Sequence, residues 1–360
     1  MAEPVVPGER PAEPPTSTQS LAHALDHLRP FDAVAADPKD QRGAEKANAV
    51  HKTDTPALDQ QKRSAHAYTS NGTEAMRNSQ DEYIPPLPTV IERIHARVQA
   101  FLAESHPPDS LLASVQRQTQ TSLGVVAEAL TRYKLSELSL SYNGGKDCLV
   151  LLILFLAGLH PYAAHAHEDH KMTTAAAAQS GEQPETSSPV DGSNPVIPAI
   201  YALPPDPFPA VEDFVISSAQ AYHLAITKYT TDPPHTTLRS SFEDYLTRHP
   251  GIRAIFVGTR RTDPHGARLT HFDRTDQGWP DFMRVHPVID WHYPEIWAFI
   301  RHLGLRYCSL YDMGYTSLGG TSDTLPNPRL RVGAEANGDD GLYLPAYELT
   351  QDLEERLGRN

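Results

Sequence analysis

The residues best suited to chemistry lie in one short stretch, Ser141-Tyr142-Asn143-Gly144-Gly145-Lys146-Asp147. Glycines let a backbone approach a phosphate closely, and the start of a helix offers free N–H groups and a partial positive charge. Lys146 adds a positive charge, and Asp147 suits either a helix N-cap or a ligand of Mg²⁺ that bridges phosphates. The stretch predicts a phosphate-binding loop, although two glycines alone are equally typical of a tight strand-to-helix turn.

Two other features bear on this loop. The stretch matches neither the Walker A pattern nor GxGxxG, so it does not predict the usual γ-phosphate or dinucleotide site. Farther along, Arg260 and Arg261 follow a predicted strand, and the guanidinium fork suits phosphate oxygens. A pair of solvated arginines is the simpler alternative. Asp263 is placed to orient one arginine or to cap the turn at Pro264.

The elements around the loop predict an open, mostly parallel α/β sheet flanked by helices. Residues 138–142 alternate as a strand does, the two glycines interrupt them, and 147–159 is an apolar helix. Further strands alternate with helices, which is typical of parallel sheets whose ligands bind at the carboxyl ends of the strands. We expect strands at 197–203, 224–229 and 254–258, helices at 84–102, 111–133, 211–223, 238–249, 293–303 and 348–357, and loops at 260–283 and 317–330.

Composition limits the classes of function. The formal net charge is −14, which argues against nucleic-acid binding. The two cysteines, Cys148 and Cys308, build no disulfide framework, and the longest apolar run, Leu149–Leu159, is too short to span a bilayer. With no signal peptide visible, we expect a cytoplasmic protein without a membrane partner. Residues 1–82 are expected to form a disordered extension, with a short helix near Ser20–Leu28, before a domain over 83–360.

A low-complexity insert is expected at about 171–195. Beside it, His165, His167 and His170 match no fixed zinc spacing, so composition explains them better than metal binding. Cys148 lies in the first turn of the predicted helix, where a thiolate would be stabilised. Since no base or resolving cysteine accompanies it, a small packed residue is the better interpretation.

The sequence Ser141–Asp147 resembles the SGGKDS loop of the PP-loop ATP pyrophosphatases. Further motifs narrow the resemblance to the eukaryotic, fungal-type FAD synthases (FMN adenylyltransferases), which are related to the PAPS reductases. It runs from about Leu138 to the C-terminus, apart from the insert. The motifs are GTRRTDP at 258–264, WPDFMR at 279–284, PVIDW at 287–291, GYTSLG at 314–319 and LPNP at 325–328.

This resemblance implies an adenine nucleotide alpha hydrolase-like fold, with a C-terminal flavin-binding loop and helix region. It implies transfer of AMP from MgATP to FMN, giving FAD and pyrophosphate. The implied catalytic residues are Asn143, Asp147, Arg260 and Arg261, with Asp147 as the metal ligand. The implied ATP and phosphate site is Leu140, Ser141, Tyr142, Asn143, Gly144, Gly145, Lys146, Tyr201 and Gly258. The implied flavin site is Asp263, Asp276, Trp279, Asp281, Arg284, Arg356 and Arg359.

FMN and ATP are thus the expected partners, with Mg²⁺ as cofactor, in a chain expected to be a monomer. Two alternatives stand against this hypothesis. A PAPS reductase-like oxidoreductase needs a redox-active cysteine near the C-terminus, but the sequence after Cys308, Ser309-Leu310-Tyr311, does not match that motif. A non-catalytic nucleotide- or flavin-binding protein is the second alternative, and the intact loop, Asp147 and arginines argue against it.

Overall fold

The computed structural model describes residues 83–160, 195–333 and 342–359. The expected helix near Ser20–Leu28, the insert at 171–195 and the histidines at 165–170 lie outside these residues. Within the described part, no helix is both long and apolar enough to cross a membrane.

A six-stranded sheet forms the centre of the fold. Its order is β3 (Leu224–Thr230), β2 (Ile197–Leu203), β1 (Leu138–Ser141), β4 (Ala254–Phe256), β6 (Met283–Val285) and β5 (Phe272–Arg274). All neighbours run parallel except β5, which is antiparallel to β6. The predicted open, mostly parallel sheet is confirmed. From β1 the chain builds β2 and β3 on one side and later β4 and β6 on the other, so the carboxyl end of β1 is a switch point that favours ligand binding.

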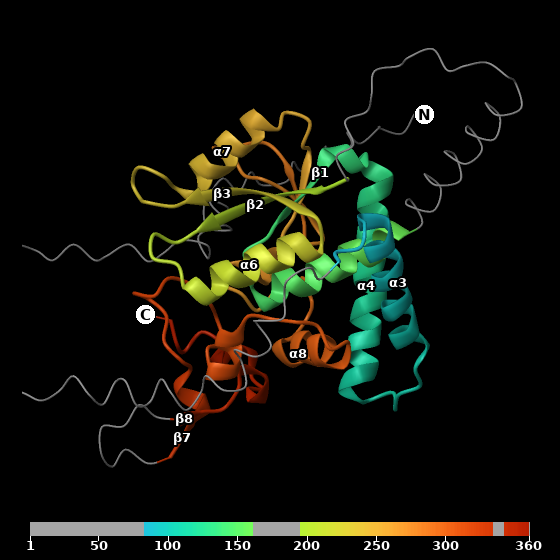
Figure 1. Ribbon diagram of the computed structural model, residues 1–360, viewed down its shortest axis with the longest axis vertical. Coiled ribbons are helices and arrows are strands. Elements are labelled where there is room, and N and C mark those ends of the chain that lie inside the picture. The colour runs from blue at the N-terminus through green and yellow to red at the C-terminus, as the bar shows by residue number, and fades with distance from the viewer. Residues whose placement is uncertain (1–82, 161–194, 334–341, 360) are drawn as a thin grey trace, which may run out of the picture. The chain divides into compact units, whose positions relative to one another are not determined.

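Alternation along the strands assigns each side chain to one of two cores. Ser139, Ile200 and Ile255 face α7 (Leu238–Arg248), where the Ser139 hydroxyl lies 2.7 Å from the Tyr245 hydroxyl. Leu140, paired in register with Ala199 and Phe256, faces the larger core on the opposite side. Because side chains of a strand alternate between faces, this sheet needs helices on both sides, as Figure 1 shows.

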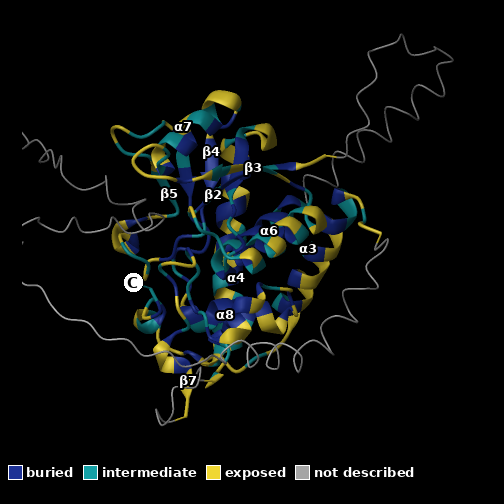
Figure 2. Ribbon diagram, turned by 60° about the vertical axis from the view of Figure 1, so that its left-hand side comes forward, coloured by how far each residue is buried: buried dark blue, intermediate teal, exposed yellow. Residues whose placement is uncertain are grey.

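The face of the sheet that packs against the larger core is covered by several helices. They are α3 (Leu87–Ala103), α4 (Leu111–Arg132), a helix whose described part is 146–160, α6 (Pro209–Ala221) and α8 (Tyr293–His302). Every residue from Leu149 to Ala157 is at most 1% exposed, so the apolar run of the sequence is the most deeply buried helix. By contrast, α3, α4 and α6 show buried and exposed residues on different flanks, as amphipathic helices do (Figure 2).

The structure differs from the sequence-based expectation in two places. Residues 260–283, expected to be loop, contain β5, and β6 begins at Met283, so the sheet gains a hairpin. The prediction of a helix at 348–357 is wrong, because only short 3-10 segments form at Ala346–Glu348 and Asp352–Glu354. Side chains of another loop bind the carbonyls there: Asn327 Nδ2 donates to Glu354 O at 2.7 Å and Thr316 Oγ1 to Glu355 O at 2.5 Å.

Candidate active site

The loop after β1 is held in shape by its neighbours. Tyr142 is buried, and its hydroxyl donates to Ser218 Oγ of α6 at 2.9 Å. Gly144 has φ +73°, a left-handed conformation that side chains rarely adopt. A Cβ at this position would lie 2.8 Å from Val215 Cγ2. Both the conformation and the close approach of α6 therefore require glycine here.

Hydrogen bonds fix the next residues of the loop. Asn143 Oδ1 accepts from Gly145 N at 2.9 Å, a local turn that shapes the backbone before the helix. Lys146 N, at the start of the helix, donates to the Tyr311 hydroxyl at 2.9 Å. The predicted strand, glycine turn and helix are thus confirmed, and hydrogen bonds within the chain shape the loop.

Lys146 does not extend into solvent. Its side chain is 2% exposed, and its Nζ lies 3.0 Å from Asp147 Oδ2 and forms an ion pair with Glu355 Oε1. The ammonium also lies 5.2 Å from the centre of the Tyr293 ring. Burial by itself would lower the pKa of Lys146, but Asp147 and Glu355 outweigh it and raise that pKa above its usual value. Lys146 therefore stays charged beneath the loop.

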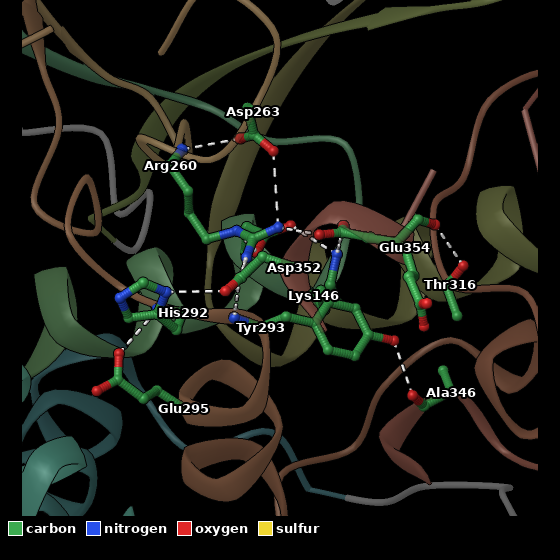
Figure 3. Close-up of polar contacts among 12 residues, drawn as sticks. Lys146, Arg260, Asp263, His292, Tyr293, Glu295, Thr316, Ala346, Asp352 and Glu354 are labelled. Carbon is green, nitrogen blue, oxygen red and sulfur yellow. Dashed lines mark hydrogen bonds and ion pairs between the residues drawn. The ribbon is translucent and has the colours of Figure 1, made fainter. Parts of the chain in front are cut away.

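Arg260 is the second buried cation, with 0% exposure. Its NH1 lies 3.2 Å from Asp352 Oδ1, its NH2 lies 3.6 Å from Asp263 Oδ1, and NH2 also pairs with Glu355 Oε2 (Figure 3). Its Nε lies 2.8 Å from Asp147 Oδ1, but at an angle that makes no hydrogen bond. Arg260 therefore links the loop after β1 to the C-terminal segment, and its guanidinium nitrogens are paired with carboxylates.

Carboxylates outnumber cations in this network. Four carboxylates, from Asp147, Asp263, Asp352 and Glu355, surround the two cations. Burial raises the pKa of Asp263 to about 6. Arg260 lowers this pKa, whereas the neighbouring carboxylates of Asp147 and Glu355 raise it further. Asp263 also accepts from Arg260 N at 2.8 Å, so it both caps the turn and orients the arginine, as predicted.

A cleft of about 1220 Å³, counted to its open mouth, lies above this network. Its walls come from the loops after β1, β2 and β4 and from the C-terminal segment. Of the predicted site residues, those lining it are Ser141, Asn143, Gly145, Lys146, Asp147, Tyr201, Gly258, Asp263, Arg356 and Arg359. Apolar residues such as Pro204, Phe208 and Leu318 also line it, so it offers both flat apolar and polar contacts.

The C-terminal segment closes one side of the cleft. Arg359 is 10% exposed, and its NH2 donates to Asp323 Oδ2 at 3.0 Å, while its Nε has no hydrogen-bond partner among the described residues. A Cβ on Gly319 would lie 2.2 Å from Arg359 NH2, so a side chain at 319 would displace this guanidinium. A buried guanidinium with an unused N–H at a cleft is suited to an anion.

Several predicted residues lie away from the cleft lining. Leu140 is a core residue of β1, and Tyr142 and Gly144 shape the loop from behind. Arg261 is 41% exposed and turns outward, because its Nε binds Asp290 Oδ1 at 2.6 Å. Arg260 is sealed in the ion network and Arg261 is bound to a surface carboxylate, so the catalytic role of both arginines stays a prediction.

The other predicted flavin residues form a separate group at the β5–β6 hairpin, outside the cleft lining. Arg284 is 1% exposed, and its NH2 donates to Arg274 O at 2.9 Å. Trp279 packs partly buried against the α7-side core, and its backbone N–H donates to Asp276 O at 2.9 Å. Asp281 is 69% exposed and pairs with Arg274 at 2.6 Å, so its role in flavin binding stays a prediction.

Sequence reasoning missed Asp352, Glu355 and Tyr311. Asp352 also accepts from Tyr293 N at 2.6 Å and lies 2.8 Å from His292 Nδ1, which Figure 3 shows together with Arg260. Acidic residues in a predicted terminal helix carry no signal of such a role. The role of Asp352 and Glu355 becomes visible only in the tertiary structure, which places them beside two buried cations.

Comparisons with known proteins agree with this geometry. The profile of the phosphoadenosine phosphosulfate reductase domain matches residues 137–326, more than half of the chain. Fold and site together thus define a nucleotide-binding α/β enzyme of the PAPS reductase-like class.

Relatives make the assignment more specific. A probable FAD synthase of Schizosaccharomyces pombe is 38% identical over 75% of this chain and 89% of that protein. The flavin adenine dinucleotide synthase of Saccharomyces cerevisiae is 34% identical over 54% of this chain and 60% of that protein. The crystal structure of Candida glabrata FMN adenylyltransferase with FAD and pyrophosphate is 28% identical, has a TM-score of 0.65, and matches 78% of this chain and 99% of that one. The chain belongs to the FAD synthases, the nucleotidyltransferases of this class.

Proposed function

We propose that this chain transfers AMP from ATP to the phosphate of FMN, giving FAD and pyrophosphate. The observation that carries the proposal is the preformed loop at the carboxyl end of β1, which opens on a cleft and rests on Lys146 and Arg260. The Candida glabrata relative was crystallised with FAD and pyrophosphate, the two products of this reaction.

The β and γ phosphates of ATP would lie against residues 143–147, where helix N–H groups and the charge of Lys146 favour anions. A phosphate oxygen of FMN attacks the α phosphorus in line. The bond that forms joins this oxygen to Pα. The bond that breaks joins Pα to the oxygen that bridges to Pβ, and pyrophosphate leaves with that electron pair. The attacking phosphate is already ionised at pH 7, so the reaction needs no strong base and no covalent enzyme intermediate. Catalysis comes from positioning and charge neutralisation.

The residues present fit Mg²⁺ at Asp147. Asp147 lines the cleft beside the loop, and its Oδ1 makes no hydrogen bond within the described structure, although it lies 2.8 Å from Arg260 Nε. An oxygen of this kind is the ligand Mg²⁺ prefers, and Mg²⁺ usually takes one or two protein carboxylates together with substrate phosphates. When bound there, the ion would neutralise phosphate charge. Lys146 Nζ holds the other oxygen, Oδ2, at 3.0 Å, so the ion would share Asp147 with both buried cations.

We assign the flavin end of the cleft to Asp263, Arg356 and Arg359, with the phosphate of FMN near the arginines. The unused Nε of Arg359 supports this assignment. Following the family resemblance, we assign the isoalloxazine ring to Trp279, with Asp276 and Arg284 at its polar edge. A flat aromatic with buried charge beside it suits such a ring.

The chemistry of the cysteines weighs against the reductase alternative. Burial raises the pKa of the Cys308 thiol, which is 1% exposed. Burial also raises the pKa of Cys148 to about 12, and Asp147 adds to that effect. A redox cysteine needs an accessible thiolate, which neither residue provides. Adenylyl transfer requires no thiol, so it agrees with both environments.

The direct test mixes the purified chain with FMN, ATP and Mg²⁺ and separates the products by chromatography. We expect FAD and pyrophosphate in equal amounts, and we expect Asp147→Ala to abolish both while the folded structure persists by circular dichroism. Absence of FAD from the wild-type reaction would overturn the proposal. Full activity of the Asp147 variant would overturn its assigned role.

A further inference from the structure

Three side chains outside the proposed active site converge at the surface where α3 and α8 end. The Nε2 atoms of His106 and His302 lie 2.9 Å and 2.8 Å from the same oxygen, Glu104 Oε2. All three donor atoms lie within 4.8 Å of one another. Nothing in the adenylyl-transfer mechanism uses these residues.

The fold presets this arrangement. Glu104 and His106 follow the last residue of α3, Ala103, and His302 is the last residue of α8. Gln116 of α4 fixes the turn, because its Nε2 donates to Phe101 O at 2.7 Å and to Glu104 O at 2.9 Å.

A buried aromatic ring supports both imidazoles from below. The Phe101 ring is 2% exposed, and its centre lies 6.3 Å from that of His106 and 5.0 Å from that of His302. The two histidine side chains are 17% and 29% exposed. The rings are therefore partly immobilised by packing while their Nε2 atoms remain open to solvent on one side.

We propose that Glu104, His106 and His302 form a binding site for a divalent transition-metal ion of the zinc class. Imidazole nitrogen and carboxylate oxygen are ligands that zinc prefers, and ligands at about 2.0–2.1 Å in a tetrahedron stand about 3.3 Å apart. The two N–O separations of 2.8 and 2.9 Å need to open by only a few tenths of an ångström, while the two nitrogens, which lie within 4.8 Å of each other, must also reach this spacing. Partial exposure leaves the fourth position to water.

The two Nε2 atoms are now placed as donors to one carboxylate. On binding, the ion takes both nitrogen lone pairs, and any proton on these nitrogens is released to solvent. The overall charge of −14 favours cation capture, but it would favour any cation, so the selectivity rests on the two nitrogens.

Such an ion would clamp α8 to the turn after α3. The opposite end of α8 carries Tyr293, whose N donates to Asp352 of the ion network. Ten helical residues separate the ends by about 15 Å, so the site is structural and does not touch substrate.

The test titrates Zn²⁺ alone into the full chain in competition with a chromophoric chelator. We compare the wild type with the double variant His106→Gln/His302→Gln. A control variant replaces His165, His167 and His170 with alanine, because these residues could bind zinc elsewhere. We expect the double variant to lose one zinc equivalent, or to bind it on the order of 100-fold more weakly. The control should retain that equivalent. Equal zinc binding by wild type and double variant would overturn the site.

Two further readouts keep the test decisive if the double variant folds poorly. Glu104→Gln preserves size, and we expect it to weaken zinc binding at an unchanged melting temperature without metal. Co²⁺ bound to the wild type should show the visible absorption of a four-coordinate site, and this band should be absent from the double variant. A six-coordinate Co²⁺ spectrum that is the same in both proteins would contradict the proposal.

Discussion

Lys146 and Arg260 carry positive charge beneath the cleft, and both are held by carboxylates. Because Arg260 is fully buried and Lys146 nearly so, neither samples many conformations, and each keeps its charge in a fixed place. Charges that need not reorganise during a reaction stabilise a transition state more effectively than mobile ones. In the proposed reaction the site would act by preorganisation, and we expect the backbone, Asp147 and the arginines of the C-terminal segment to contact the substrates.

The flavin assignment predicts the effect of Arg284→Ala. Removing a buried charged donor should raise the KM for FMN by about 10- to 100-fold, the range of a charge-assisted hydrogen bond, and change the KM for ATP little. Steady-state kinetics with each substrate varied in turn measures both constants. Arg248→Ala, at a residue 66% exposed in a surface pair, is the matched control. Equal increases in both KM values would count against a flavin contact at Arg284.

Among the elements, the turn from β1 into the helix at 146–160 depends on one glycine. Gly144→Ala places a Cβ 2.8 Å from Val215 Cγ2 at φ +73°, so the loop must move away from α6. We expect loss of most activity and destabilisation by more than about 1 kcal/mol. Gly124→Ala is the control, since nothing lies within 4 Å of the added Cβ and alanine favours a helix.

Urea unfolding and FAD formation measured on both glycine variants separate the two outcomes. The Gly124 variant should be equally or more stable and fully active. A Gly144 variant with wild-type kinetics would show that the loop does not need this conformation.

The C-terminal segment is the second element that the site requires, because Glu355 bridges Lys146 and Arg260. Glu355→Gln leaves two buried cations with one partner fewer, and breaking a buried pair costs about 3–5 kcal/mol. We expect a lower free energy of unfolding and a kcat reduced by about 100-fold, the order of effect of losing a preorganised charge.

Glu348→Gln, at an exposed residue of the same segment, is the matched control and should leave both quantities unchanged. Urea unfolding and kcat at saturating FMN and ATP give the comparison. Equal behaviour of the two variants would exclude the bridging role of Glu355.

For the whole molecule, the order of the strands explains why an acidic chain can hold anionic substrates. The net charge of −14 is a property of the entire sequence, whereas the strand order gathers helix N–H groups, Lys146, Arg356 and Arg359 at the switch point beside β1. Because Asp147, Asp263, Asp323 and Glu355 also line the cleft, phosphate binding there would rely on directed N–H groups and a bound cation, not on an excess of positive side chains. Field strength near a site depends on nearby charges, because salt screens distant exposed ones.

The buried network also makes global stability depend on pH. Burial raises the pKa of Asp263 to about 6, above the usual aspartate value of 3.8, so between these pH values the folded state holds a proton that the unfolded state has released. Stability from this group is therefore full below about pH 4 and falls as pH rises through about 6. Asp263→Asn removes the titration, so the wild-type free energy of unfolding, relative to the variant, should decrease across this window. Urea unfolding at a series of pH values measures it, and an increase would contradict the assignment.

Much of this protein was predictable from local sequence. Alternation in 138–141, the short apolar run at 197–203, the glycine break and the apolar helix after it indicated the parallel sheet and its loop, because hydrophobic patterning and backbone freedom act over a few residues. The motifs around this core, through their resemblance to FAD synthases, indicated the family that the comparisons confirmed.

Tertiary structure alone decided the rest. Strand β6, Met283-Arg284-Val285, has a charge at its centre and gives no strand signal, and it forms because β4 and β5 flank it. Glu355 pairs with Lys146, which lies 209 residues earlier in the sequence. Where this contact is made, the helix expected at 348–357 does not form. Local patterns specify the strand, the turn and the helix, but long-range charge pairing determines which side chains complete the site, and pairing between distant residues has no sequence period.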